Sequence, residues 1–105
     1  MQSSRFAWFT PARHRERRQR VSRQDRLLQQ TGYRCGYCGC ELTRQTVTRD
    51  HIVPRAHGGR TTDDNLIAAC QGCNQRKGDL EVETFRELYF GGDQFWIEIL
   101  EEGAA

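Results

Sequence analysis

The clearest helical pattern of apolar and polar positions lies in the first third of the chain. Leu27 and Leu28 form an apolar pair within the otherwise polar segment 23–31. Ser22 precedes this segment as an N-capping residue, and Gly32 follows it as a residue that ends helices. The pattern therefore predicts a helix over residues 23–31 that buries its two leucines.

The middle of the chain has the pattern of two strands. Residues 46–53 are rich in β-branched side chains and end at Pro54, which predicts the first strand. The pair Gly58-Gly59 then indicates a loop that extends to Asp63-Asp64. Residues 65–69, which are apolar after Asn65, predict a second strand that returns beside the first.

The last quarter of the chain gives one clear element and one ambiguous one. From Leu80 onward, Phe85, Leu88 and Tyr89 have helical spacing, and the glycines at 91 and 92 would end that helix. Residues 93–102 fit a helix or a strand equally well, so periodicity does not decide between them. We expect this segment to cover a small core, and an exposed apolar stripe on it would indicate self-association.

Four cysteines in two pairs indicate a metal site. Cys35 and Cys38 form one C-x-x-C knuckle, and Cys70 and Cys73 form the other. Such knuckles direct all four sulfurs at one point, which is typical of structural zinc, and a chain of 105 residues has little core to stabilise it otherwise. Cys40 could replace Cys35 as a ligand, but we expect it to be a free thiol. A disulfide scaffold would leave one of the five cysteines unpaired.

Positive charge is concentrated at the start of the chain. Residues 1–34 carry nine arginines against two acidic residues, a net charge of +7, and residues 35–105 carry seven basic against twelve acidic residues, a net charge of −5. Thr10-Pro11 resembles a helix start, and the arginine-rich residues after it would be helical only against DNA. The basic block therefore predicts a nucleic-acid partner, although a solvated tail without a partner is the alternative.

Composition also bears on location. Residues 1–10 lack the apolar core of a signal peptide, and no apolar run reaches membrane-spanning length. We therefore expect a cytoplasmic protein without a membrane partner, as a monomer or weak homodimer. In a reducing compartment the paired cysteines favour a metal over disulfides.

A second set of polar residues indicates a site other than the zinc knuckle, because zinc binding does not require them. Asp50 and His51 lie at the end of the first predicted strand, and Asn74 directly follows the last cysteine. A carboxylate and an amide oxygen suit Mg²⁺ or Mn²⁺, and a neutral imidazole can take a proton from water. Neighbouring strand residues point to opposite faces, so a shared site predicts a bend or bulge at Asp50-His51, and a regular pleat would count against it.

The ordered motifs resemble those of the HNH endonucleases, in their zinc-stabilised branch. The motifs are Cys-x-x-Cys, Asp50-His51-Ile-Val-Pro, Gly58-Gly59, Asn65-Leu66 and Cys-x-x-Cys-Asn74-x-x-Lys-Gly, within residues 32–79. The resemblance implies an α+β fold with a ββα-metal core, in which a two-stranded hairpin packs on one helix. The chain would then consist of a basic arm and helix (1–31), the nuclease domain (32–79) and a helical extension that packs on the core (80–105).

The resemblance also implies roles for individual residues. His51 would be the general base, and Asp50 and Asn74 would bind the catalytic Mg²⁺ or Mn²⁺. Asn65 would tie the loop to the hairpin and orient His51. Many relatives have histidine where this chain has Asn74, which makes it an H-N-N variant and disfavours catalytic zinc. The reaction would be phosphodiester hydrolysis that leaves 5′-phosphate and 3′-hydroxyl ends.

Contacts with DNA are predicted from basic residues and one loop histidine. The residues are Arg13, Arg17, Arg20, Arg55, His57, Arg76 and Lys77, with Arg60 as a further candidate. Two other functions remain open. A non-catalytic zinc-knuckle adaptor would bind DNA regardless of Asp50, His51 and Asn74. A rubredoxin-like protein would bind iron at the cysteines and be coloured. The setting, recognition sequence and choice between nicking and double-strand cleavage are undetermined.

Overall fold

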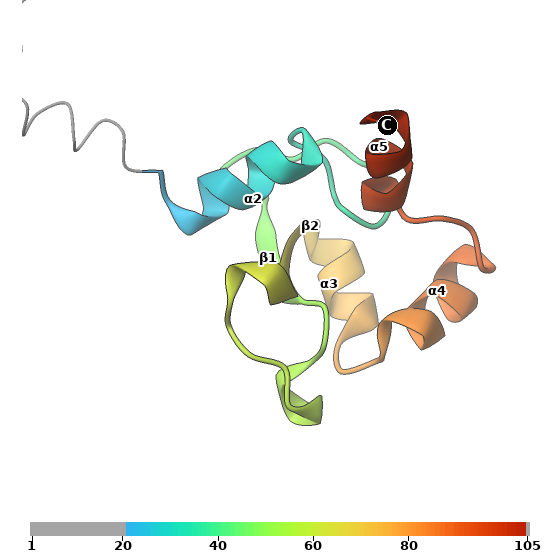
Figure 1. The fold of residues 1–105 in the computed structure, drawn as a ribbon. Helices are drawn as coiled ribbons and strands as arrows, with labels where there is room; N and C mark the ends of the chain where they lie inside the picture. Colours follow the sequence, from blue (N-terminus) through green and yellow to red (C-terminus); the bar gives the residue numbers. More distant parts are fainter. Residues whose placement is uncertain (1–20, 105) are drawn as a thin grey trace, which may run out of the picture.

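A computed structural model describes residues 21–104. The predicted arm, the helix start at Thr10-Pro11, and Arg13, Arg17 and Arg20 therefore lie outside the described residues. Figure 1 shows a two-stranded sheet surrounded by helices, which is the α+β architecture that the motifs predict. Within the described residues, no helix is both long enough and apolar enough to cross a membrane.

The hairpin consists of β1 (Thr48–His51) and β2 (Leu66–Ala69), which pair antiparallel. β1 is shorter than the predicted strand 46–53. At its start, Thr46 belongs to a turn, in which its amide donates to the Thr43 carbonyl (3.1 Å). At its end, the Ile52 amide donates to the Asn65 carbonyl (2.9 Å), and the chain then leaves the sheet. β2 is buried throughout.

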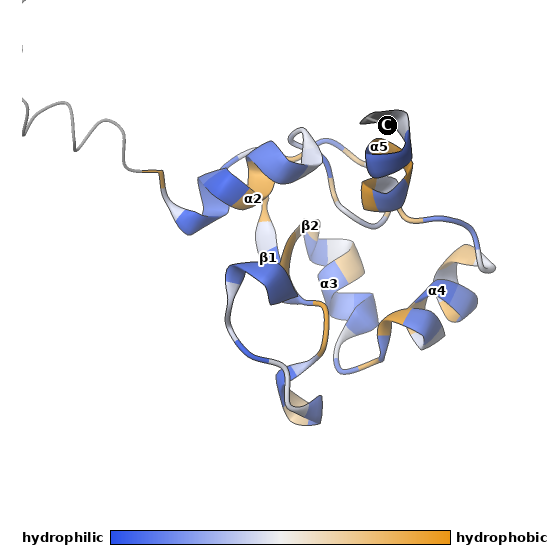
Figure 2. Ribbon diagram, in the orientation of Figure 1, coloured by the Kyte–Doolittle hydropathy of each residue, from blue (hydrophilic) through white to orange (hydrophobic). Residues whose placement is uncertain are grey.

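Helix α2 (Arg23–Thr31) forms as predicted and covers the sheet. The Ser22 side chain accepts a hydrogen bond from the Asp25 amide, and Gly32 ends the helix in the left-handed region with φ of 67°. Leu27 and Leu28 are fully buried against the core. Figure 2 shows this apolar stretch of α2 and the apolar strand β2 within largely hydrophilic surroundings.

Helix α3 (Gln71–Lys77) follows β2 and packs on β1, which completes the ββα unit. Between the strands, the chain forms two single 3₁₀ turns, η1 (Arg55–His57) and η2 (Asp63–Asn65). Gly58 follows η1 with φ of 89°, a conformation that favours glycine. The loop predicted from Gly58-Gly59 to the two aspartates thus follows η1 and ends in η2.

The C-terminal extension is helical, and its helices are α4 (Val82–Phe90) and α5 (Trp96–Ala104). Residues 93–102, which fitted a helix or a strand, thus contribute to a helix. On α4, only Phe85 of the predicted apolar face is buried, whereas Leu88 is 65% and Tyr89 50% exposed. The aromatic core is made instead by Phe85, Phe90 and Phe95, whose rings contact one another.

Candidate active site

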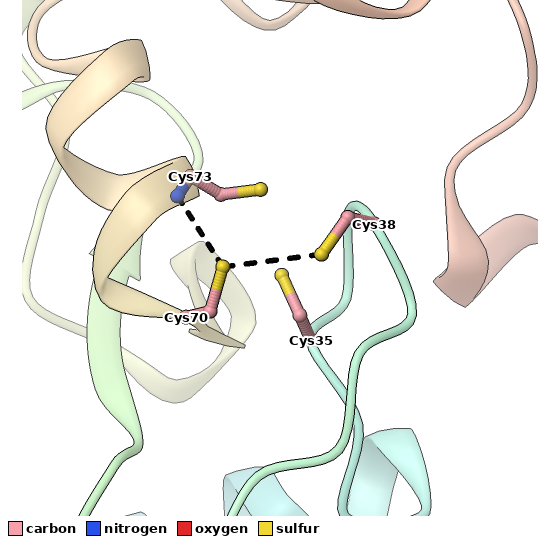
Figure 3. Close-up of side chains that lie close together, drawn as sticks. All are labelled: Cys35, Cys38, Cys70 and Cys73. Carbon is pink, nitrogen blue, oxygen red and sulfur yellow. Dashed lines mark hydrogen bonds between the residues drawn. The ribbon is translucent and has the colours of Figure 1, made fainter.

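The four cysteines of the two knuckles converge on one point. Cys35 and Cys38 come from the loop after α2, and Cys70 and Cys73 come from the start of α3 (Figure 3). The four sulfur atoms all lie within 4.8 Å of one another, and those of Cys38 and Cys70 are 3.9 Å apart. A Zn–S bond of about 2.3 Å gives a tetrahedron with edges of about 3.8 Å, so this set fits a zinc ion.

The protonation of these thiols reflects their closeness. A hydrogen bond with Cys73 lowers the pKa of Cys35 to about 4, whereas burial raises the pKa of Cys38. A bound cation would favour the thiolate form of all four cysteines. Cys40 lies outside this set, and burial together with the nearby sulfurs raises the pKa of its thiol to about 12.

The second predicted site is also assembled. Asp50 and His51 at the end of β1, and Asn74 on α3, line one cavity of about 180 Å³. Pro54, Arg55, Gly78 and Asp79 complete its wall. The carboxylate, the imidazole and the amide thus border the same space, although Asn74 lies 24 positions after Asp50 in the sequence.

The predicted bend or bulge at Asp50-His51 is wrong. Asp50 pairs with Ile67 and His51 pairs with Leu66, one residue against one. We expected a regular pleat to count against a shared site, yet both residues line the cavity. His51 is the last paired residue of β1, so a cavity at the strand end is accessible to both.

Asp50 is held by two buried groups. Its side chain is 4% exposed, and its Oδ2 atom accepts a hydrogen bond from the Tyr37 hydroxyl (2.5 Å) and lies 3.2 Å from Lys77 Nζ. Within residues 21–104, its other oxygen, Oδ1, has no hydrogen-bond partner. Burial raises the pKa of Asp50, although Tyr37 and Lys77 both act to lower it. A positive ion at Oδ1 would favour the carboxylate further.

Lys77, which the sequence predicts to contact DNA, is buried in this structure. Its side chain is 0% exposed, and Nζ donates a hydrogen bond to the His51 carbonyl (2.8 Å) in addition to its ion pair with Asp50. A charge buried without partners would be costly, and these two contacts compensate it. Lys77 thereby fixes the end of β1 against α3.

His51 has a partner that sequence reasoning missed. Its Nε2 atom lies 2.9 Å from the Thr61 hydroxyl, which belongs to the loop between the strands. The Asn65 side chain holds this loop on β1, because its Nδ2 donates to the carbonyls of Arg60 (2.9 Å) and Val53 (3.1 Å). Asn65 thus contacts Arg60, the residue next to Thr61. A hydroxyl ten residues beyond the histidine has no sequence signal that would identify it.

The other predicted DNA contacts have varied surroundings. Arg55, His57, Arg60 and Arg76 are exposed, and Arg55 borders the cavity. His57 Nε2 lies 3.0 Å from the Asp79 carbonyl, which connects η1 to the end of α3. The Arg76 guanidinium lies 6.0 Å from the centre of the Tyr89 ring and 3.8 Å from Cys73 Sγ. Only Arg55 of these four is thus placed directly at the cavity.

Comparison with known proteins finds a matching family model and similar proteins. A model of the family described as HNH endonuclease matches residues 35–90. Two curated relatives, both named CRISPR-associated endonuclease Cas9, are 47% identical in Corynebacterium diphtheriae and 40% identical in Actinomyces naeslundii, each over 53 residues. These matches cover 50% of this chain but 5% of each relative.

A solved structure gives the same result for the fold. The crystal structure of the Type II-C Cas9 enzyme from Actinomyces naeslundii matches with a TM-score of 0.57 and 31% identity. The match covers 72% of this chain and 9% of that protein. This chain is therefore similar to one small part of a much longer enzyme.

Proposed function

This chain belongs to the HNH endonuclease family, and from that premise we propose that it is a metal-dependent DNA endonuclease or nickase. It would hydrolyse phosphodiester bonds and leave 5′-phosphate and 3′-hydroxyl ends. The observation that carries the proposal is the cavity that Asp50, His51 and Asn74 border together. A simple zinc knuckle has no need of an acid, a base and an amide that converge in this way.

Asp50 and Asn74 are the protein ligands that we propose for the catalytic cation. The Oδ1 atom of Asp50 has no partner within residues 21–104, and the side chain borders the cavity. The Asn74 amide oxygen can supply a second, neutral ligand, and such oxygen donors suit Mg²⁺ or Mn²⁺ better than zinc. The bound cation would stabilise negative charge on the phosphate and the leaving 3′ oxygen.

His51 is the general base in this proposal. Its imidazole is half-exposed at the end of β1, so an attacking water can reach it. When Nε2 donates its proton to the Thr61 hydroxyl, the lone pair of Nδ1 is free to accept a proton from that water. Thr61 and Asn65 would then act on the orientation and tautomer of the base rather than on the substrate.

The four cysteines would hold zinc as a structural ion. Their sulfurs connect the loop after α2 to the start of α3, the helix that carries Asn74. Four thiolates leave no open position for water or substrate at such an ion. The zinc would therefore stabilise the site without taking part in hydrolysis.

DNA as the substrate is supported by charge and by the relatives. The net charge of +7 over residues 1–34 favours binding to phosphates without regard to sequence. The two curated relatives are named as CRISPR-associated endonucleases. One domain with a single active site cuts one strand per binding event, so we expect nicked plasmid to appear before linear plasmid.

The test is plasmid cleavage by the zinc-loaded protein with Mg²⁺, with Mn²⁺ or with neither, with nicked and linear products resolved. Wild type should cleave with either metal, and His51→Ala should lose at least about 100-fold in rate while it keeps zinc and DNA binding. On α3, Asn74→Ala should lose activity, whereas its exposed neighbour Gln75→Ala should not. Cleavage that survives in His51→Ala would exclude the assigned base. Binding without cleavage by wild type would favour the adaptor module.

A further inference from the structure

One residue contacts both the cysteine site and the candidate active site. Tyr37 lies between the two cysteines of the first knuckle, and its amide is 3.4 Å from the sulfur of Cys35. Its side chain points the other way, and its hydroxyl donates to Oδ2 of Asp50 (2.5 Å). The residue is 3% exposed, so water does not compete for this hydrogen bond.

The ring of Tyr37 is held by the C-terminal extension. Phe85 of α4 and Phe95 before α5 contact it edge-on, with ring centres 5.2 and 4.7 Å away. The amide of Trp96 also donates to the Tyr37 carbonyl (3.0 Å). Figure 1 shows α5 beside the loop that contains this knuckle and α4 beside α3. The extension thus fixes where the Tyr37 hydroxyl points.

Asp50 receives two donors on one oxygen. Tyr37 and Lys77 both contact Oδ2, so the carboxylate cannot rotate without breaking a buried hydrogen bond and a buried ion pair. This arrangement leaves Oδ1 as the oxygen that is available to a ligand in the cavity. Partners of this kind, behind a metal ligand, commonly change metal affinity by about 10- to 100-fold when they are removed.

We propose that Tyr37 is a positioning residue that orients Asp50 for the divalent cation and so connects the zinc knuckle and the C-terminal helices to the active site. This inference rests on the proposed function, since it takes Asp50 as the metal ligand. It gives residues 80–104 a role in activity although none of the helical residues of α4 and α5 borders the cavity.

The test is direct Mn²⁺ binding to zinc-loaded protein without DNA, followed by the electron paramagnetic resonance signal of free Mn²⁺. Tyr37→Phe keeps the ring and its packing but removes the hydroxyl. We expect its Mn²⁺ dissociation constant to rise by about tenfold with one zinc still bound per chain. Tyr33→Phe is the matched control, because Tyr33 precedes the same knuckle but is 45% exposed. Equal Mn²⁺ affinity in these two variants would overturn the inference.

Two further variants keep the result decisive. If Tyr37→Phe fails to retain zinc, Phe95→Leu serves instead. It removes an aromatic contact to the Tyr37 ring but keeps the Tyr37 hydroxyl and the cysteines. It should also weaken Mn²⁺ binding, and wild-type affinity would overturn the inference. Asp50→Asn tests the underlying site. If Asp50→Asn loses Mn²⁺ binding but Tyr37→Phe does not, the role of Tyr37 is refuted and the metal site stands. If Asp50→Asn binds Mn²⁺ like wild type, the metal site itself is refuted.

Discussion

At the residue scale, the candidate site depends on side chains that orient other side chains. Asp50 is contacted by Tyr37 and Lys77, and His51 is contacted by Thr61. None of these three partners would need to touch DNA or metal to matter for activity. Displacing a reacting group by about 1 Å can cost about 100-fold in rate, so their removal should be measurable in cleavage.

Thr61 gives the most direct prediction at this scale. Thr61→Val keeps the shape of the side chain but removes the hydroxyl that lies 2.9 Å from His51 Nε2. We expect the single-turnover cleavage rate to fall by about 10- to 100-fold, because the imidazole loses the partner that fixes its orientation. DNA affinity of the zinc-loaded protein, measured without Mg²⁺ or Mn²⁺, should not change. Thr61→Ser restores a hydroxyl and should recover most of the rate. A Ser variant as slow as the Val variant would show that packing of the methyl group matters instead.

The sequence identifies the residues that carry chemistry better than it identifies their partners. Asp50, His51 and Asn74 can be found because their types and spacing match a chemical task, and all three line the cavity. For a lysine near a helix end, the sequence offers DNA contact or simple solvation, and neither interpretation includes the burial that Lys77 has. Its burial depends on β1 packing against α3, which is a tertiary contact. The contacts of Tyr37 and Thr61 depend on tertiary packing in the same way.

At the scale of elements, the loop between the strands acts as a support for the site. The amide of Gly59 donates to the Pro54 carbonyl (2.9 Å), and this turn keeps Arg60 and Thr61 near β1. A Cβ atom on Gly59 would lie 1.7 Å from the Val53 carbonyl oxygen and 2.9 Å from Asn65 Nδ2. The glycine is therefore needed for close approach of the backbone. At Gly58 a Cβ would meet nothing within 4 Å, and only the φ of +89° favours glycine.

These two glycines form a matched pair of variants. Gly59→Ala must push the loop away from Val53 and disturb the hold of Asn65, so cleavage should fall by at least about tenfold, with a loss of about 1–3 kcal/mol in unfolding free energy. Gly58→Ala should cost about 1 kcal/mol through backbone strain but leave cleavage near the wild-type rate. Urea unfolding and single-turnover cleavage on the same preparations would measure both. Similar activities for the two variants would contradict the role of the loop.

Elements with local signals were predicted well, and those that depend on packing were not. α2 has a cap, an apolar pair and a terminal glycine in its own sequence, and its bounds agree with the prediction. β1 is shorter than its β-branched run, because Thr46 is used in a turn and the Asn65 amide donates to the Thr62 carbonyl instead of to Ile52. From Trp96 onward this segment forms helix because Phe95 and Trp96 pack on the knuckle loop. The apolar periodicity of residues 93–102 could not predict this contact with the knuckle loop.

At the scale of the whole molecule, the cysteine site joins segments that the small core alone holds weakly. Chelation of zinc should abolish cooperative thermal unfolding, since apparent zinc-binding free energies of about 10–16 kcal/mol exceed the stability of a typical small domain. Cys38→Ser should lose zinc. Cys40 is also exposed but is not one of the four clustered cysteines, so Cys40→Ser should retain one zinc ion per chain. Metal analysis and melting curves would measure this. Equal zinc loss in both variants would mean that Cys40 is a ligand.

The division of charge along the chain predicts how DNA affinity depends on salt. Arg17 and Arg20 belong to the basic segment, whereas Arg23 and Arg26 on α2 form ion pairs with Asp63 (2.9 and 3.0 Å). Replacing Arg17 and Arg20 by Gln should lower the slope of log affinity against log salt by up to about 1.8, because two phosphate contacts release fewer counterions. The Arg23 and Arg26 double variant loses the same net charge but should change the slope less, since both groups already bind a carboxylate. Binding of zinc-loaded protein, without Mg²⁺ or Mn²⁺, to a short duplex over a salt series would measure both slopes. Equal slopes for the two double variants would show that the salt dependence of DNA binding depends only on the net charge of the protein.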